Sequence, residues 1–210
     1  QLFFSDIEPL AASKVLVRME NETLSIGERI LAQGLQLTIR GQEKIGIIGP
    51  NGVGKSTLLA KLHQLLSNKR EISLGFMPQD YKKTLQLELS PVEFLSQTGH
   101  KDELQKIQSH LASLNFSYPE MHHQIHSLSG GQQGKLLLLN LVLRKPNFLL
   151  LDEPTRNFSP TSQPEIRKLF ANFPGGLVTV SHDRRFLKEV CTTIYRLTEH
   201  GLEVVDLQDL

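Results

Sequence analysis

The chain has 210 residues, 39% of them hydrophobic, and its 23 basic and 22 acidic residues give a net charge of +1. This balance excludes a dedicated nucleic-acid-binding domain, which would carry a strong positive charge. No apolar stretch approaches the roughly 20 residues that a membrane-spanning helix needs, so no direct membrane insertion is expected. The single cysteine, Cys191, cannot form an internal disulfide, which fits a reducing cytoplasm, and we expect it to be a buried small residue.

Two strands with alternating apolar residues come first in the chain. One covers residues 15 to 19, and the other is marked by Leu35, Leu37 and Ile39. Alternation of this kind is typical of strands with one buried face. We expect the two strands to form an antiparallel flank of the core.

A glycine-rich loop follows the strand-like residues 43 to 48. This phosphate loop reads Gly49-Pro50-Asn51-Gly52-Val53-Gly54-Lys55-Ser56-Thr57 and matches the pattern G-x-x-x-x-G-K-[ST]. Its backbone N–H groups can turn toward phosphate oxygens, its lysine reaches the β- and γ-phosphates, and its serine hydroxyl can bind Mg²⁺. Leucines at helical spacing from Leu58 to Leu66 predict a helix whose positive end adds to the site.

Gln79 follows a short strand-like stretch. A glutamine there can contact both Mg²⁺ and the attacking water, although a lone glutamine after a strand is usually a solvated loop residue. Beyond it the sequence becomes helical, with a capping box at Ser90-Pro91-Val92-Glu93 and a second helix from about Asp102 to Leu114. We interpret this stretch as a small helical subdomain.

The subdomain ends at a signature segment, Leu128-Ser129-Gly130-Gly131-Gln132, followed by Gln133-Gly134. An apolar helix is predicted from Leu136 to Leu143, directly after this segment. The N-terminus of such a helix offers free N–H groups and a positive dipole to an anion.

A buried strand is predicted at residues 148 to 151, and it ends in the carboxylates Asp152 and Glu153. Ligands of open α/β sheets lie at the carboxyl ends of the strands. Asp152 can therefore hold Mg²⁺, and Glu153 can act as the general base toward water. The alternative is that Asp152 only caps a helix.

The last third of the chain repeats this alternation of strand and helix. Ser162 to Glu165 has the pattern of a capping box and predicts a helix toward Asn172, after which Gly175-Gly176 turns the chain into a strand. His182 follows that strand, where it can position water and stabilise developing charge, although a lone histidine there is usually solvated. Residues 193 to 207 alternate around Gly201 like a closing hairpin.

The phosphate loop, glutamine, signature, carboxylate pair and histidine occur in one order along the chain, and over nearly its full length the chain resembles an ATP-binding cassette (ABC) domain. The resemblance implies an α/β fold with a P-loop NTPase core, a parallel sheet, an antiparallel β flank and a small α-helical subdomain. It also implies a single domain, with a core lobe at about 10–85 and 136–210 and a helical subdomain at about 86–135.

The resemblance assigns roles to individual residues as well, with ATP and Mg²⁺ as the ligands. Catalytic roles fall to Glu153, His182 and Gln79, and Mg²⁺ ligation falls to Ser56, Gln79 and Asp152. Nucleotide binding falls to Gly49, Pro50, Asn51, Gly52, Val53, Gly54, Lys55, Ser56 and Thr57 of the phosphate loop, and to Ser129, Gly130, Gly131 and Gln132 of the signature segment. The signature is expected to complete the site of a second cassette, in the same full-length chain or in a homodimer, so that ATP lies between two cassettes.

The phrases around the signature and His182 look like those of the F subclass. Its members are cytoplasmic proteins that act on the ribosome as translation factors or in antibiotic resistance, and this chain would be the C-terminal cassette, with ribosome or rRNA contacts through regions outside it. The alternatives are the ATPase motor of a transmembrane transporter subunit and a module that binds ATP without hydrolysing it.

Three positions depart from the family pattern. Ile26 stands where an aromatic residue usually stacks on adenine, so stacking is weakened or comes from elsewhere. Ser159 stands where an interface aspartate is usual, which predicts different coupling between the two sites. Gln133-Gly134 keeps the phosphate-binding glycines but is expected to alter the turn that follows them.

Overall fold

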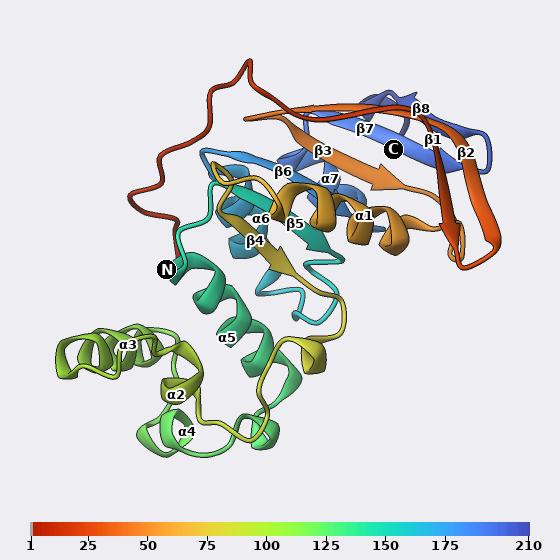
Figure 1. Ribbon diagram of the computed structural model, residues 1–210. Coiled ribbons are helices and arrows are strands. Elements are labelled where there is room, and N and C mark those ends of the chain that lie inside the picture. Colours follow the sequence, from red (N-terminus) through yellow and green to blue (C-terminus); the bar gives the residue numbers. More distant parts are fainter. Residues whose placement is uncertain (1) are drawn as a thin grey trace.

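A computed structural model describes residues 2–210 and contains two β-sheets with helices packed around them (Figure 1). The larger sheet has six strands in the order β4-β5-β6-β3-β7-β8, of which only β8 runs antiparallel to its neighbour. Its strands are β3 (Lys44–Ile48), β4 (Leu74–Met77), β5 (Phe148–Asp152), β6 (Gly176–Val180), β7 (Thr193–Thr198) and β8 (Gly201–Val205). The parallel sheet and the closing hairpin β7–β8 are confirmed.

Two hydrophobic cores lie on the two faces of this sheet. Alternate residues of β5 belong to different cores, Leu150 to one and Leu149 to the other, because successive side chains of a strand point to opposite faces. The first core includes α1 (Lys55–Ser67), which contacts both the large sheet and β1. The second includes α5 (Gly130–Leu143), α6 (Gln163–Ala171) and α7 (Arg184–Val190). Every residue of β5 and β6 is buried, as strands covered on both sides should be.

The smaller sheet is a long antiparallel hairpin of β1 (Val15–Ile26) and β2 (Arg29–Arg40). The antiparallel flank is confirmed, but both strands extend well beyond the residues predicted for them. The pairing contains several register shifts between Val15 and Ser25, and these bulges break the simple alternation on which the sequence prediction depends. Figure 1 shows the hairpin at the edge of the molecule, with α1 lying between it and the large sheet.

The helical segment consists of α2 (Pro91–Leu95), α3 (Lys101–Ser113) and α4 (Tyr118–His122), which lie away from the sheets at one end of α5 (Figure 1). The Ser90–Glu93 capping box forms as predicted. A second box, at Ser117 and Glu120, starts α4. The Glu103 carboxylate accepts hydrogen bonds from Ser96 and from the backbone of the preceding loop, and these bonds lower its pKa to about 2. No helix within residues 2–210 is long and apolar enough to cross a membrane.

The capping box predicted at Ser162 is absent, although α6 itself is present. Ser162 has helical backbone angles, and its side chain caps no backbone N–H group. Its N–H already donates to the Ser159 carbonyl, and its hydroxyl bonds to the Ser159 hydroxyl. The prediction was wrong because a turn precedes the helix, whereas a capping side chain needs an extended residue at that position.

Cys191 is a structural residue at the end of α7. It is 5% exposed, and burial raises the pKa of its thiol to about 12, against the opposing effect of the Lys44 cation. A thiol held in its protonated form is a poor nucleophile. The expectation of a buried small residue is confirmed.

Candidate functional site

The phosphate loop joins β3 to α1 and depends on glycine backbone angles. Gly52 and Gly54 have φ angles of 82° and 108°, in the left-handed region that favours glycine. A Cβ atom on Gly54 would also lie 3.0 Å from Leu31 Cδ1 and 3.1 Å from Leu24 Cδ2 of the hairpin. The loop is thereby held between β3, α1 and the hairpin.

Lys55 lies inside this loop as a buried cation. Its side chain is drawn back onto the loop, where Nζ donates to the carbonyl oxygens of Gly49 and Pro50, the latter at 3.0 Å. Burial lowers the pKa of Lys55, while the nearby Glu153 and Asp152 carboxylates act in the opposite direction. An ammonium group that has only carbonyl partners can exchange them for phosphate oxygens, which bind a cation more strongly.

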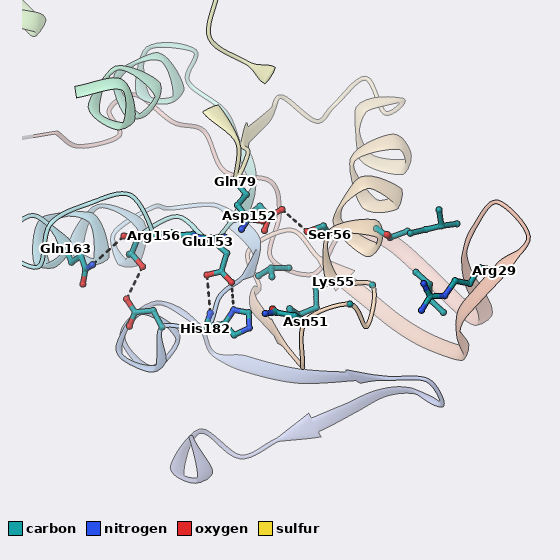
Figure 2. Close-up of a pocket in the computed structure, with 18 residues that line it drawn as sticks. Arg29, Asn51, Lys55, Ser56, Gln79, Asp152, Glu153, Arg156, Gln163 and His182 are labelled. Atoms are coloured by element: carbon teal, nitrogen blue, oxygen red, sulfur yellow. Dashed lines mark hydrogen bonds and ion pairs between the residues drawn. The ribbon is translucent and has the colours of Figure 1, made fainter. Parts of the chain in front are cut away.

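Asp152 and Ser56 form a polar pair at the start of α1 (Figure 2). The Ser56 hydroxyl donates to Asp152 Oδ2 at 3.1 Å. Asp152 Oδ1 is buried and has no hydrogen-bond partner within residues 2–210, and burial raises the pKa of the carboxyl. A buried carboxylate oxygen without a donor, beside a hydroxyl and near the Gln79 amide, matches the oxygen ligands that Mg²⁺ prefers.

Glu153 and His182 contact each other directly. Glu153 Oε2 accepts the backbone N–H of His182 at 3.2 Å, and its Oε1 lies against the His182 Nδ1 (Figure 2). Glu153 has a φ of 52°, an uncommon backbone angle for a residue with a side chain, and its N–H donates to Val180 at the end of β6. The ends of β5 and β6 thus bring together two residues that are distant in the sequence.

These groups surround one open pocket of about 870 Å³. The predicted residues that line it are Asn51, Gly52, Gly54, Lys55, Ser56, Thr57, Gln79, Asp152, Glu153 and His182. The predicted residues Gly49, Pro50 and Val53 belong to the same loop but do not line the pocket, and neither do Ser129, Gly130, Gly131 and Gln132. The volume lies within the range of small-molecule sites.

Other lining residues were missed by the sequence analysis: Arg29, Leu31, Thr155, Arg156, Gln163, Val180 and Asp183. Thr155 donates its hydroxyl to Asp183 Oδ2 at 2.9 Å, and this bond ties the loop after β5 to the start of α7. Both residues lie within two positions of predicted site residues, so closeness in sequence was the signal available for them. Arg29 lies three residues after Ile26, which the family resemblance places at the base, so closeness in sequence was a signal for it as well.

The signature segment forms the N-terminus of α5. The Ser129 hydroxyl accepts the N–H of Gln132 at 3.2 Å, and the Gln132 side chain accepts the N–H of Ser129 at 3.0 Å. This box starts the helix at Gly130, earlier than the predicted start at Leu136. Cβ atoms on Gly130 and Gly131 would meet nothing within 4 Å in residues 2–210. Packing within this chain therefore does not explain why glycine stands at these two positions.

The turn that follows the signature is helical, because α5 runs unbroken through Gln133 and Gly134. A Cβ atom on Gly134 would lie 2.7 Å from Phe158 Cζ and 3.2 Å from the Tyr81 hydroxyl. The signature helix, the loop after Gln79 and the loop carrying Ser159 are therefore in close contact at one point.

Gly134→Ala is expected to lower the free energy of unfolding by about 1–3 kcal/mol, because overpacking outweighs the better helix propensity of alanine. Urea unfolding of the purified variant measures this change. Adding Phe158→Leu to Gly134→Ala removes the clashing Cζ and should restore part of the loss. A Gly134→Ala variant at least as stable as the wild type would show that the Phe158 ring moves aside at no cost.

Comparison with known proteins identifies this arrangement. A family model described as ABC transporter matches residues 32–156, more than half of the chain. The chain belongs to the ABC transporter family. ABC cassettes hydrolyse ATP, and the matched residues of this ABC domain include both the phosphate loop and the Asp152–Glu153 pair.

Curated relatives match almost the whole ABC domain. The chain is 30% identical over 210 residues to the probable ATP-binding protein YheS of Escherichia coli K12, and 31% identical over 210 residues to the putative ATP-binding protein YdiF of Bacillus subtilis. It is 27% identical over 199 residues to ABC transporter F family member 2 of Arabidopsis thaliana. These alignments cover 97%, 96% and 91% of this chain but 33%, 32% and 29% of the relatives. The chain thus spans about a third of the length of these relatives.

Solved structures confirm the fold. The dimeric ATP-binding cassette MJ0796 in a post-hydrolysis state with ADP and Pi superposes with a TM-score of 0.74 at 20% identity, covering 90% of this chain and 98% of that one. The α/β architecture with a mixed sheet, an antiparallel hairpin and a helical segment is therefore that of an ABC cassette.

Proposed function

We propose that this chain hydrolyses ATP at a composite site, formed by its own phosphate loop and the signature segment of a second cassette. The observation that carries this proposal is that the phosphate loop and the signature segment of one chain do not line the same pocket. The pocket holds Lys55, Asp152, Glu153 and His182, whereas the signature segment lines no part of it. A second cassette can bring its signature to the open side of this pocket.

The proposed chemistry follows from the polar and charged side chains around the pocket. Asp152, Ser56 and Gln79 would hold Mg²⁺, which neutralises charge on the transferring phosphate. Lys55 binds the β- and γ-phosphate oxygens in place of its carbonyl partners. Glu153 accepts a proton from the attacking water, and His182 orients that carboxylate through the two contacts between them.

The open glycines of the signature support the role of the second cassette. The capping box uses the N–H groups of Ser129 and Gln132 and not those of Gly130 and Gly131, which lie in the first turn at the positive end of α5. Because neither glycine carries a side chain, a γ-phosphate can approach this helix end closely. The solved cassette MJ0796 is dimeric, and a similar pairing would place ATP between two copies of this fold.

The larger assignment rests on the F-subclass resemblance. The Arabidopsis relative is named as a member of the F family, so we assign the chain to a cytoplasmic protein with two cassettes that acts on the ribosome, in translation or in antibiotic resistance. In that protein, residues 1–210 form one nucleotide-binding domain with a helical subdomain near 86–135. Contacts with the ribosome or rRNA are made through regions outside this chain.

Fractionation of source-cell lysate in MgATP tests this assignment, with the full-length protein detected by an antibody to this domain. We expect the protein to sediment with ribosomes, and to leave them when ATP is exchanged for ADP, because loss of the γ-phosphate contacts opens the paired cassettes. Recovery with membranes in both nucleotides would overturn the ribosomal role and support the transporter motor.

A further inference from the structure

The tip of the β1–β2 hairpin forms one end of the nucleotide pocket. Ile26, Arg29 and Leu31 line this end. Leu31 packs directly against the phosphate loop at Gly54, so the tip is held next to the phosphate site. Figure 2 shows Arg29 on the hairpin, on the opposite side of Lys55 from Glu153 and His182. The phosphates and the attacking water occupy the end near Glu153, which leaves the hairpin end for the base.

Arg29 is the planar side chain at this end. Ile26 and Leu31 are aliphatic, and Ile26 is 58% exposed. Ile26 and Arg29 pair directly across the turn at Gly27 and Glu28, so their side chains lie on the same face of the hairpin. Arg29 takes part in none of the ion pairs formed within residues 2–210. Its guanidinium group is therefore available to a ligand.

We propose that the Arg29 guanidinium stacks on the purine base of the bound nucleotide, with Ile26 and Leu31 as the apolar surroundings of the ring. This role deepens the proposed nucleotide-binding function and rests on it. A guanidinium group is planar and weakly hydrated, and it stacks on aromatic rings through both π and cation–π contact. Arg29 thus supplies the flat surface that neither aliphatic neighbour can provide.

Stacking of this kind predicts a particular selectivity. It recognises the face of a base and not its hydrogen-bonding edge, and every purine has such a face. The three residues at this end include no amide or carboxylate side chain that reads the edge. ATP and GTP should therefore bind with similar affinity, and both should depend on Arg29 to the same degree.

Binding isotherms of MgATP, MgGTP and inorganic tripolyphosphate with Mg²⁺ test the proposal on the chain and three variants. Arg29→Ala should weaken ATP and GTP binding about fivefold to thirtyfold, the range expected for a lost stacking or cation–π contact. It should leave tripolyphosphate binding unchanged, since that ligand has no base. Arg29→Tyr should retain most of the ATP affinity, because a ring replaces the planar group without its charge.

Several outcomes would overturn the role of Arg29. Equal weakening of tripolyphosphate by Arg29→Ala would show a phosphate contact instead. An unchanged ATP affinity in Arg29→Ala would exclude stacking of Arg29 on the base. An Arg29→Tyr variant that binds ATP as weakly as Arg29→Ala would exclude it too. The third variant, Lys55→Ala, is the control and should lose ATP and tripolyphosphate together. Failure of the unaltered chain to bind either ligand would overturn the proposed function itself, and the role of Arg29 with it.

Discussion

Glu153→Gln is expected to slow ATP hydrolysis by about 100-fold or more and to leave ATP binding intact, because a general base contributes roughly this factor. The amide has the shape of the carboxylate, but it cannot accept a proton from water at neutral pH. It can still accept the backbone N–H of His182, which now donates to Glu153 Oε2 at 3.2 Å. The arrangement of the pocket should therefore persist while proton transfer is lost.

Single-turnover hydrolysis with protein in excess over ATP measures the chemical step directly. The slow variant should also accumulate as a pair of cassettes with ATP trapped between them. Sedimentation velocity in MgATP measures this association. Adding Gly131→Asp to Glu153→Gln should abolish the pair, because a carboxylate would face the γ-phosphate. Glu203→Gln, at an exposed residue of β8, is the matched control and should behave as the wild type. Normal turnover in Glu153→Gln would exclude Glu153 as the base.

Much of this site could be predicted from the sequence because its residues stand at the ends of strands. Asp152 is the last residue of β5, and Gln79, Glu153 and His182 follow β4, β5 and β6 within two residues. Parallel neighbouring strands end at the same edge of a sheet, so a strand prediction also places the side chains that follow it. The contact between Glu153 and His182 is a direct result of this topology.

The remaining features depend on contacts that no local pattern reveals. Arg29 lies near Ile26 in the sequence, but its place in the pocket depends on the packing of the hairpin on Gly54, which is a tertiary contact. Ser162 fits a capping pattern, yet the turn from Ser159 gives it helical angles. Gly134 lowers the helix propensity of its segment, and only the close contact with the Phe158 ring explains why glycine stands there. For Arg29 and Gly134, packing between distant segments decides the outcome over local propensity, whereas for Ser162 a neighbouring turn does.

Asp152→Asn is expected to reduce hydrolysis by at least about 100-fold, because it removes the proposed ligand of Mg²⁺. The nucleotide-free chain should stay as stable as the wild type or become more stable, because the buried site disfavours the charge of the carboxylate. Asp152 is 8% exposed, and its Oδ1 has no hydrogen-bond partner within residues 2–210. Burial raises the pKa of this carboxyl above its value in the unfolded chain. At neutral pH, ionised Asp152 therefore lowers the free energy of unfolding. Asparagine removes that charge and can keep the bond from Ser56.

Thermal unfolding with and without MgATP separates the two roles of Asp152. The nucleotide-free variant should have a Tm equal to or above that of the wild type, and MgATP should raise the Tm of the wild type more than that of the variant. Asp183→Asn provides the contrast, because both Asp183 oxygens already accept hydrogen bonds, from Thr155 and from the first turn of α7. That variant should lower the Tm in either condition. A fall in the nucleotide-free Tm of Asp152→Asn, like that expected for Asp183→Asn, would show that the Asp152 carboxylate stabilises the fold. Its oxygen without a hydrogen-bond partner would then not mark a ligand site.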